Sequence, residues 1–325
     1  MSDGPPQEVC RRLAAALLGA ADLTGLDVAR AGGVDLDDLH RLWRALGFPP
    51  VAADDRRFTR ADVEMVRALR VLVDEQRADP SDVLQLTRVV GHAMARVGDA
   101  QVTAIAERLR ARREDAATDA SAGELAARIG ELAPTLERLL GHVWRRHLVA
   151  ALLRVAATPL AADRSAIVGF ADLVDFTATS RALDGREITA IVDRFEAVAY
   201  EHVLAHGGRI VKTIGDEVMF SVDETAGAAA IALALVDAHT RDPRLPLVRV
   251  GIAGGPIVAW QGDLFGTTVN LASRLADFAR PGTVVVSDEV GEALRGSPEL
   301  ALRHLRAVTL KGIGRARTWV VRRAG

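Results

Sequence analysis

The sequence has a single cysteine, Cys10, so it can form neither an internal disulfide framework nor a thiolate metal site. No apolar run approaches the ~20 residues that span a bilayer, since the longest candidate, 148–162, contains Arg154 and Pro159. The N-terminus lacks the basic and apolar regions of a secretory signal. The net charge of −2 shows no field suited to nucleic acid or membranes. We therefore expect a globular, cytoplasmic protein without a membrane span or a nucleic-acid partner.

Lysine and asparagine are also scarce. Only Lys212 and Lys311 among the 41 basic residues are lysines, and Asn270 is the single asparagine. The composition is typical of a chain in which arginine replaces lysine wherever the replacement is tolerated. An ammonium is a compact point charge and a guanidinium a planar fork, so a lysine that remains marks a candidate functional site. The alternative interpretation is chance survival.

The apolar pattern divides the chain into a helical first part, 1–157, a linker, 158–164, and a mixed second part, 165–325. In the first part we expect helices over 9–21, 24–30, 35–46, 59–76, 82–97, 101–114 and 124–155. The second and third of these, separated by Gly32 and Gly33, resemble a helix-turn-helix of the MerR type. The third helix begins with acidic residues, which would repel DNA phosphates. A packing or regulatory role is therefore favoured, and DNA binding stays as a rival.

After the linker the apolar period changes to that of strands and helices in alternation. The sequence predicts strands over 167–171, 210–214, 217–221, 247–253, 256–261, 283–287, 302–310 and 318–322. It predicts helices over 185–206, 224–239, 267–279 and 288–294. The core order β-α-β-β-α-β is the ferredoxin-like arrangement. We expect an α+β fold with a mainly antiparallel sheet and helices on one of its faces.

Two aspartates in this part are carried at the ends of predicted strands. Asp172 follows a short apolar run, and Asp216 lies in the turn of the predicted hairpin. Hard divalent cations prefer oxygen ligands, and Mg²⁺ often takes one or two carboxylates together with substrate phosphates. These residues therefore indicate a metal site for a nucleoside triphosphate.

Five sequence blocks resemble the catalytic domain of class III adenylate and guanylate cyclases. They occur in the family's order over about half of the chain, at residues 170–177, 211–216, 248–252, 262–274 and 310–312. The resemblance implies a ferredoxin-like sheet and a homodimer whose copies pair head to tail. The helical first part is similar in size and placement to the regulatory segment of soluble, autoinhibited actinobacterial cyclases.

The resemblance also implies a role for each matching residue. These are metal binding for Asp172, Asp216 and the backbone carbonyl of Leu173; phosphate binding for Arg249, Lys311 and the backbone amides of Phe176 and Thr177; purine recognition for Lys212 and Asp263; and transition-state contacts for Asn270 and Arg274. The implied cofactors are two divalent metal ions, Mg²⁺ or Mn²⁺. Both lysines and the asparagine fall on these positions, which favours a working enzyme.

The implied substrate is ATP, because a lysine donor and an aspartate acceptor suit the N1 acceptor and N6 donor of adenine. The implied reaction is attack of the ribose 3′-hydroxyl on the α-phosphate, which yields 3′,5′-cyclic AMP and pyrophosphate. The metal aspartates would come from one copy, and Asn270, Arg274, Lys212 and Asp263 from the other. The alternatives are a guanylate cyclase, or a DNA-binding regulator with an inactive nucleotide-binding domain.

One departure from the family pattern is Asp175, which stands where many members have glycine.

We also expect regulation of the helical first part by protons or a small molecule. His142 and His147 lie close to the linker, and histidine is the side chain type that serves proteins as a switch near neutral pH. Our hypothesis is that residues 1–155 restrain the catalytic dimer and that this region transmits a pH signal. Two ordinary surface or packing histidines are the alternative.

Overall fold

The computed structural model describes residues 5–74, 79–111, 122–157 and 164–325. Contacts within the chain divide it into two compact units, 1–158 and 159–325. All but the last residue of the expected linker, 158–164, lies outside the described residues. No helix in the described ranges combines the length and the apolar character that crossing a membrane requires.

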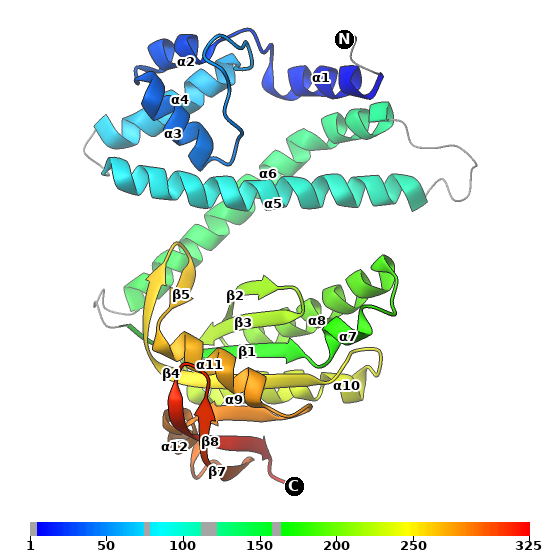
Figure 1. The fold of residues 1–325 in the computed structure, drawn as a ribbon, viewed down its shortest axis with the longest axis vertical. Coiled ribbons are helices and arrows are strands. Elements are labelled where there is room, and N and C mark those ends of the chain that lie inside the picture. The colour runs from blue at the N-terminus through cyan, green and yellow to red at the C-terminus, as the bar shows by residue number, and fades with distance from the viewer. Residues whose placement is uncertain (1–4, 75–78, 112–121, 158–163) are drawn as a thin grey trace. The chain divides into compact units, whose positions relative to one another are not determined.

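The first unit is built from helices (Figure 1). They are α1 (Pro5–Leu18), α2 (Gly25–Gly32), α3 (Leu36–Ala45), α4 (Arg60–Asp74), α5 (Pro80–Ala111) and α6 (Ala122–Ala157). Thr24 caps α2 as expected, since its hydroxyl accepts a hydrogen bond from the Asp27 amide and the Asp27 carboxylate accepts one from the Thr24 amide. Val28, Leu39 and Phe58 form the centre of a small core where α2, α3 and α4 meet.

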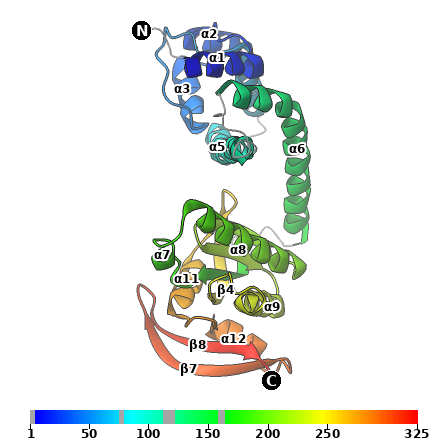
Figure 2. The ribbon, with the colours of Figure 1, turned by 90° about the vertical axis from the view of Figure 1, so that its right-hand side faces the viewer.

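Two expectations for this unit are wrong. Residues 82–97 and 101–111 belong to one helix, α5, because the glycine between them, Gly98, costs a helix only about 1 kcal/mol and does not end it. Pro134 lies inside α6 rather than near a helix start. Figure 2 shows a bend in α6, for which an internal proline is the usual cause, because its ring removes one backbone hydrogen bond and displaces the preceding turn.

The second unit is a mixed sheet covered by helices. Its elements are β1 (Arg164–Leu173), α7 (Phe176–Thr179), α8 (Gly185–Ala205), β2 (Arg209–Ile214), β3 (Glu217–Val222), α9 (Thr225–Val236), α10 (Ala238–Arg241), β4 (Val248–Trp260), β5 (Asp263–Phe265), α11 (Thr267–Phe278), β6 (Val284–Ser287), α12 (Asp288–Leu294), β7 (Leu300–Leu310) and β8 (Gly314–Arg323). The strand order is β2-β3-β1-β4-β6-β8-β7, with β5 paired to β4. Strands β1 to β4 thus have the ferredoxin-like order, which confirms the predicted α+β fold.

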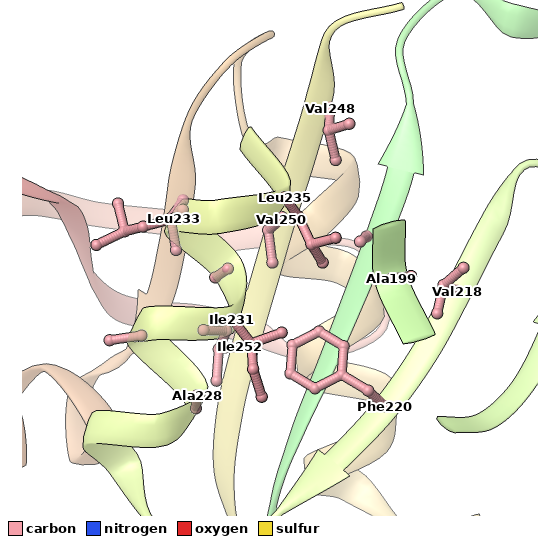
Figure 3. Close-up of a cluster of buried hydrophobic side chains, with 14 of the residues drawn as sticks. Ala199, Val218, Phe220, Ala228, Ile231, Leu233, Leu235, Val248, Val250 and Ile252 are labelled. Carbon is pink, nitrogen blue, oxygen red and sulfur yellow. The ribbon is translucent and has the colours of Figure 1, made fainter. Parts of the chain in front are cut away.

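Helices cover both faces of this sheet, so the expectation of one covered face is wrong. Ile167 and Leu173 of β1 pack in the core that contains residues of α8, α9 and α12. Val168 and Phe170, which point to the opposite face, pack in a second core with residues of α11. Figure 3 shows the first core, in which Phe220 of β3 lies among side chains of α8, α9 and β4.

Strand β4 is longer than expected. The predicted strands 247–253 and 256–261 form one strand, Val248–Trp260, because β1 pairs with it without interruption as far as Ile257. Beyond that point β4 pairs with β5, a short strand that the sequence did not predict. Asp263, one of the candidate site residues, is the first residue of β5, so the extended end of β4 fixes its position in the sheet.

Candidate active site

A pocket of about 420 Å³ lies at the end of β1. The residues that line it are Asp172, Leu173, Asp175, Phe176, Ala178, Arg181, Asp216 and Arg249. The pocket therefore brings together most of the residues expected to bind metal and phosphate. Their chemical roles stay predictions.

The pairing of β1 explains why these side chains meet. Asp172 lies opposite Glu217 of β3 on one side and opposite Arg249 of β4 on the other. The Leu173 amide donates a hydrogen bond to the Asp216 carbonyl at 3.2 Å, which ties the β2–β3 turn to the end of β1. Leu173 and Phe176 are buried, so the loop that enters the pocket is anchored in the core on both sides.

Arg249 forms an ion pair with Asp172 that the sequence did not reveal. The Nε and Nη2 atoms of Arg249 lie 2.7 and 2.5 Å from Asp172 Oδ2. Its Nη1 donates to the backbone carbonyl of Asp277, at 3.1 Å. All three nitrogens of this guanidinium are thus engaged by the protein. The signal that would have found the pair is the register of β1 and β4, which sequence periodicity does not fix.

Carboxylates near the pocket have altered proton affinities. Burial raises the pKa of Asp172, and its hydrogen bond with Arg249 opposes this change. Burial, followed by the negative charge of Asp172, raises the pKa of Glu217 to about 7. Sequence reasoning missed Glu217, although it directly follows Asp216. A cluster of carboxylates that resists ionisation is an environment that a bound cation would relieve.

The donor set fits hard divalent cations. Asp172 and Asp216 offer carboxylate oxygens and Leu173 a backbone carbonyl, which are the ligand types that Mg²⁺ and Mn²⁺ prefer. Among the described residues, no three or more histidine, cysteine or acidic side chains converge as a complete metal cage. The remaining ligands would have to come from substrate phosphates and water, as is common for Mg²⁺.

Asp175 opens α7 with a left-handed backbone, at φ 55°. This conformation favours glycine, and aspartate is one of the residues that tolerate it. The Asp175 carbonyl accepts hydrogen bonds from the amides of Ala178 and Thr179, which closes the turn. The backbone at this position is therefore one that both glycine and aspartate can adopt.

The residues expected to read the purine form a second, separate cluster. Lys212 Nζ lies 2.6 Å from Asp263 Oδ2, and Asp263 Oδ1 accepts a hydrogen bond from the Leu264 amide at 2.7 Å. The Lys212 ammonium also lies 6.0 Å from the centre of the Phe265 ring. The donor and the acceptor are thus held side by side next to an aromatic surface.

The remaining predicted residues lie outside the pocket. Asn270 and Arg274 are exposed on α11, where Arg274 Nη1 lies 2.9 Å from Asp277 Oδ2. Lys311 is exposed in the turn between β7 and β8. None of these residues lines the pocket of Asp172 and Asp216 within the same chain. Each chain therefore carries two incomplete sets of predicted site residues.

Comparison with known proteins identifies the class. Residues 161–323 match the adenylate and guanylate cyclase catalytic domain, which defines the second unit as a nucleotide cyclase domain. Residues 12–155 match the adenylate cyclase regulatory domain. The chain belongs to the adenylate cyclase family and combines these two domains.

Three relatives illustrate this membership. The chain is 38% identical to an adenylate cyclase of Streptomyces coelicolor over 87% of its own length and 74% of that protein's. It is 33% identical to an adenylate cyclase of Glutamicibacter nicotianae over 91% and 77%. It is 32% identical to a pH-sensitive adenylate cyclase of Mycobacterium tuberculosis over 84% and 70%.

The raised pKa of Glu217 leads to a prediction about stability. The folded state holds this proton more tightly than the unfolded state, so the stability that Glu217 contributes is greatest below pH 4.5 and falls as the pH rises to about 7. In metal-free protein, Glu217→Gln should therefore unfold at a higher temperature than the wild type at pH 8 and at a similar temperature near pH 4.5. Thermal unfolding across this range measures the difference.

Glu289→Gln is the matched control, because Glu289 is exposed on α12. Its unfolding temperature should follow that of the wild type at every pH. If the unfolding temperatures of Glu217→Gln and the wild type differ by the same amount at every pH, the pKa of Glu217 is not raised.

Proposed function

We propose that this chain converts ATP into 3′,5′-cyclic AMP and pyrophosphate at active sites shared between two copies. The observation that carries the proposal is the separation of the predicted residues into two sets, one lining the pocket and one outside it. The named adenylate cyclases among the relatives support the choice of reaction. We further propose that residues 165–325 are the catalytic domain and that residues 1–157 regulate it.

A two-fold symmetric pair would join the sets. In such a dimer the same surfaces meet twice, so the pocket of each copy faces the second set of its partner and two equivalent sites result. The neighbourhood of Lys212 and Asp263 suits burial in an interface. Large apolar side chains remain exposed there, namely Val258, Trp260, Phe265 and Ile214.

In this scheme each set has a distinct task. Asp172, Asp216 and the Leu173 carbonyl would hold divalent ions, which lower the pKa of the 3′-hydroxyl and neutralise phosphate charge when bound. From the other copy, Asn270 would hold the ribose in position for in-line attack. Arg274 would stabilise the charge that develops at the α-phosphate as pyrophosphate leaves.

The ion pair that Arg274 forms within its own chain is weak enough for a substrate phosphate to replace it. Its ion pair with Asp277 joins residues three apart on one helix, and the two side chains are 45% and 55% exposed. Such exposed pairs contribute little, ~0.2–1 kcal/mol, so a phosphate of the substrate can replace the carboxylate at small cost.

Mixing inactive variants tests the shared site. Asp172→Ala and Asn270→Ala should each abolish cyclic AMP formation, because each damages both sites of its own dimer. Random exchange of subunits should restore about a quarter of wild-type activity, since half of the dimers are mixed and each mixed dimer holds one intact site. The measurement is cyclic AMP formation before and after mixing.

A mixture of Asp172→Ala with Asp216→Ala is the matched control. Both changes damage the same set, so no arrangement of these subunits contains an intact site. Recovery in this control, or none in the first mixture, would argue against sites shared between copies.

The ion pair of Lys212 and Asp263 supports adenine as the base. Guanine presents the opposite donor and acceptor polarity, so the double variant Lys212→Glu with Asp263→Cys should lower the preference for ATP over GTP by at least about tenfold. The ratio of kcat/KM values for the two nucleotides measures this. Each single change should reduce turnover of both, because it leaves a partly buried polar partner without its ion pair. An unchanged ratio in the double variant would point to other specificity residues.

We also propose control by the first unit, with protons as the signal. His142 and His147 are exposed on α6, the last helix of that unit, and one relative is named pH-sensitive. The activity of the full chain should change more between about pH 5 and pH 8 than that of a 160–325 fragment. His142→Gln with His147→Gln should flatten the profile of the full chain, whereas His92→Gln, on α5, should not. Matching profiles of fragment and full chain would end this proposal.

A further inference from the structure

One arginine in the pocket has no role predicted from the sequence. Arg181 lines the same 420 Å³ pocket as Asp172 and Asp216. It follows α7 in the loop that leads to α8, and none of the matching sequence blocks contains it. Its position near the expected phosphate-binding backbone of Phe176 places it where it can contact the substrate.

The backbone around Arg181 is fixed by hydrogen bonds and by a buried side chain. Phe176 is buried, and its carbonyl accepts a hydrogen bond from the Ser180 amide at 2.7 Å. The Arg181 amide donates to the Ala178 carbonyl, and the Ala182 amide to the Thr179 carbonyl. The side chain of Arg181, in contrast, is exposed and has no hydrogen-bond or ion-pair partner among the described residues.

The other arginine of the pocket is not free in this way. Arg249 directs two nitrogens to Asp172 and the third to the Asp277 carbonyl. To grip a phosphate with its fork, Arg249 would have to release a carboxylate that is expected to bind metal. Arg181 has no such contact to give up. Because a guanidinium matches phosphate oxygens in a two-pronged geometry, Arg181 is the better placed of the two for that task.

We infer that Arg181 binds the terminal phosphates of the nucleotide and keeps hold of the pyrophosphate until it leaves. This inference rests on the proposed function, since it assumes a nucleoside triphosphate in the pocket. Arg181 would also counter the negative charge that Asp175 adds to the lining of this pocket.

The test uses the full-length chain with Arg181→Ala, Arg181→Lys and the control Arg303→Ala. Arg303 is exposed on β7, at the far edge of the sheet from β2, and its removal changes the net charge equally. For Arg181→Ala the KM for ATP and the inhibition constant of pyrophosphate should both rise about tenfold, with kcat changed little. Arg181→Lys should fall between Arg181→Ala and the wild type, and Arg303→Ala should match the wild type.

Inhibition by adenosine, which has no phosphates, should be the same in all four proteins. If Arg181→Ala behaves like Arg303→Ala, the inference is wrong and the proposed function stands. If the wild-type chain makes no cyclic AMP, the proposed function fails instead. Calorimetric titration with tripolyphosphate and Mn²⁺ then still decides about Arg181, since equal affinities for the wild type and Arg181→Ala would overturn its role.

Discussion

The central position of β1 is the constraint on which the site depends. Because β1 pairs with both β3 and β4, the end of this strand forces Asp172 between Glu217 and Arg249. Removing a carboxylate from water is costly unless a partner compensates it. Arg249 does so for Asp172. For Glu217 the positive charge of Arg249 offsets the effects of burial and of the Asp172 charge only in part, so the pKa of Glu217 is raised. The fold thus concentrates negative charge where a cation is most useful.

Much of this arrangement follows from sequence. The change of apolar period after residue 164 predicts the β-α-β-β-α-β order, and the positions of Asp172 and Asp216 at strand ends predict a shared pocket. The face of the sheet that α11 covers could not be predicted, since amphipathicity shows that a helix has a buried side but not what buries it. Nor could the Arg249–Asp172 pair, because strand register depends on packing across the whole sheet.

Sequence motifs also say nothing about which polar groups are already occupied. Arg249 and Arg181 look equally suited to phosphate when only residue type is considered. In the fold one is engaged at every nitrogen and the other is free among the described residues. The same distinction separates Lys212, paired with Asp263, from Lys311, which is exposed in a turn. Assigning roles from a motif therefore requires the contacts of each member as well as its identity.

Sharing a site between copies has a physical consequence for regulation. If neither set of residues suffices alone, activity is set by how often two copies meet in the productive arrangement. A regulatory signal then does not have to act on a catalytic group. It only has to interact with the productive and the unproductive arrangement with different free energies. A shift of about 1.4 kcal/mol between them changes their ratio tenfold.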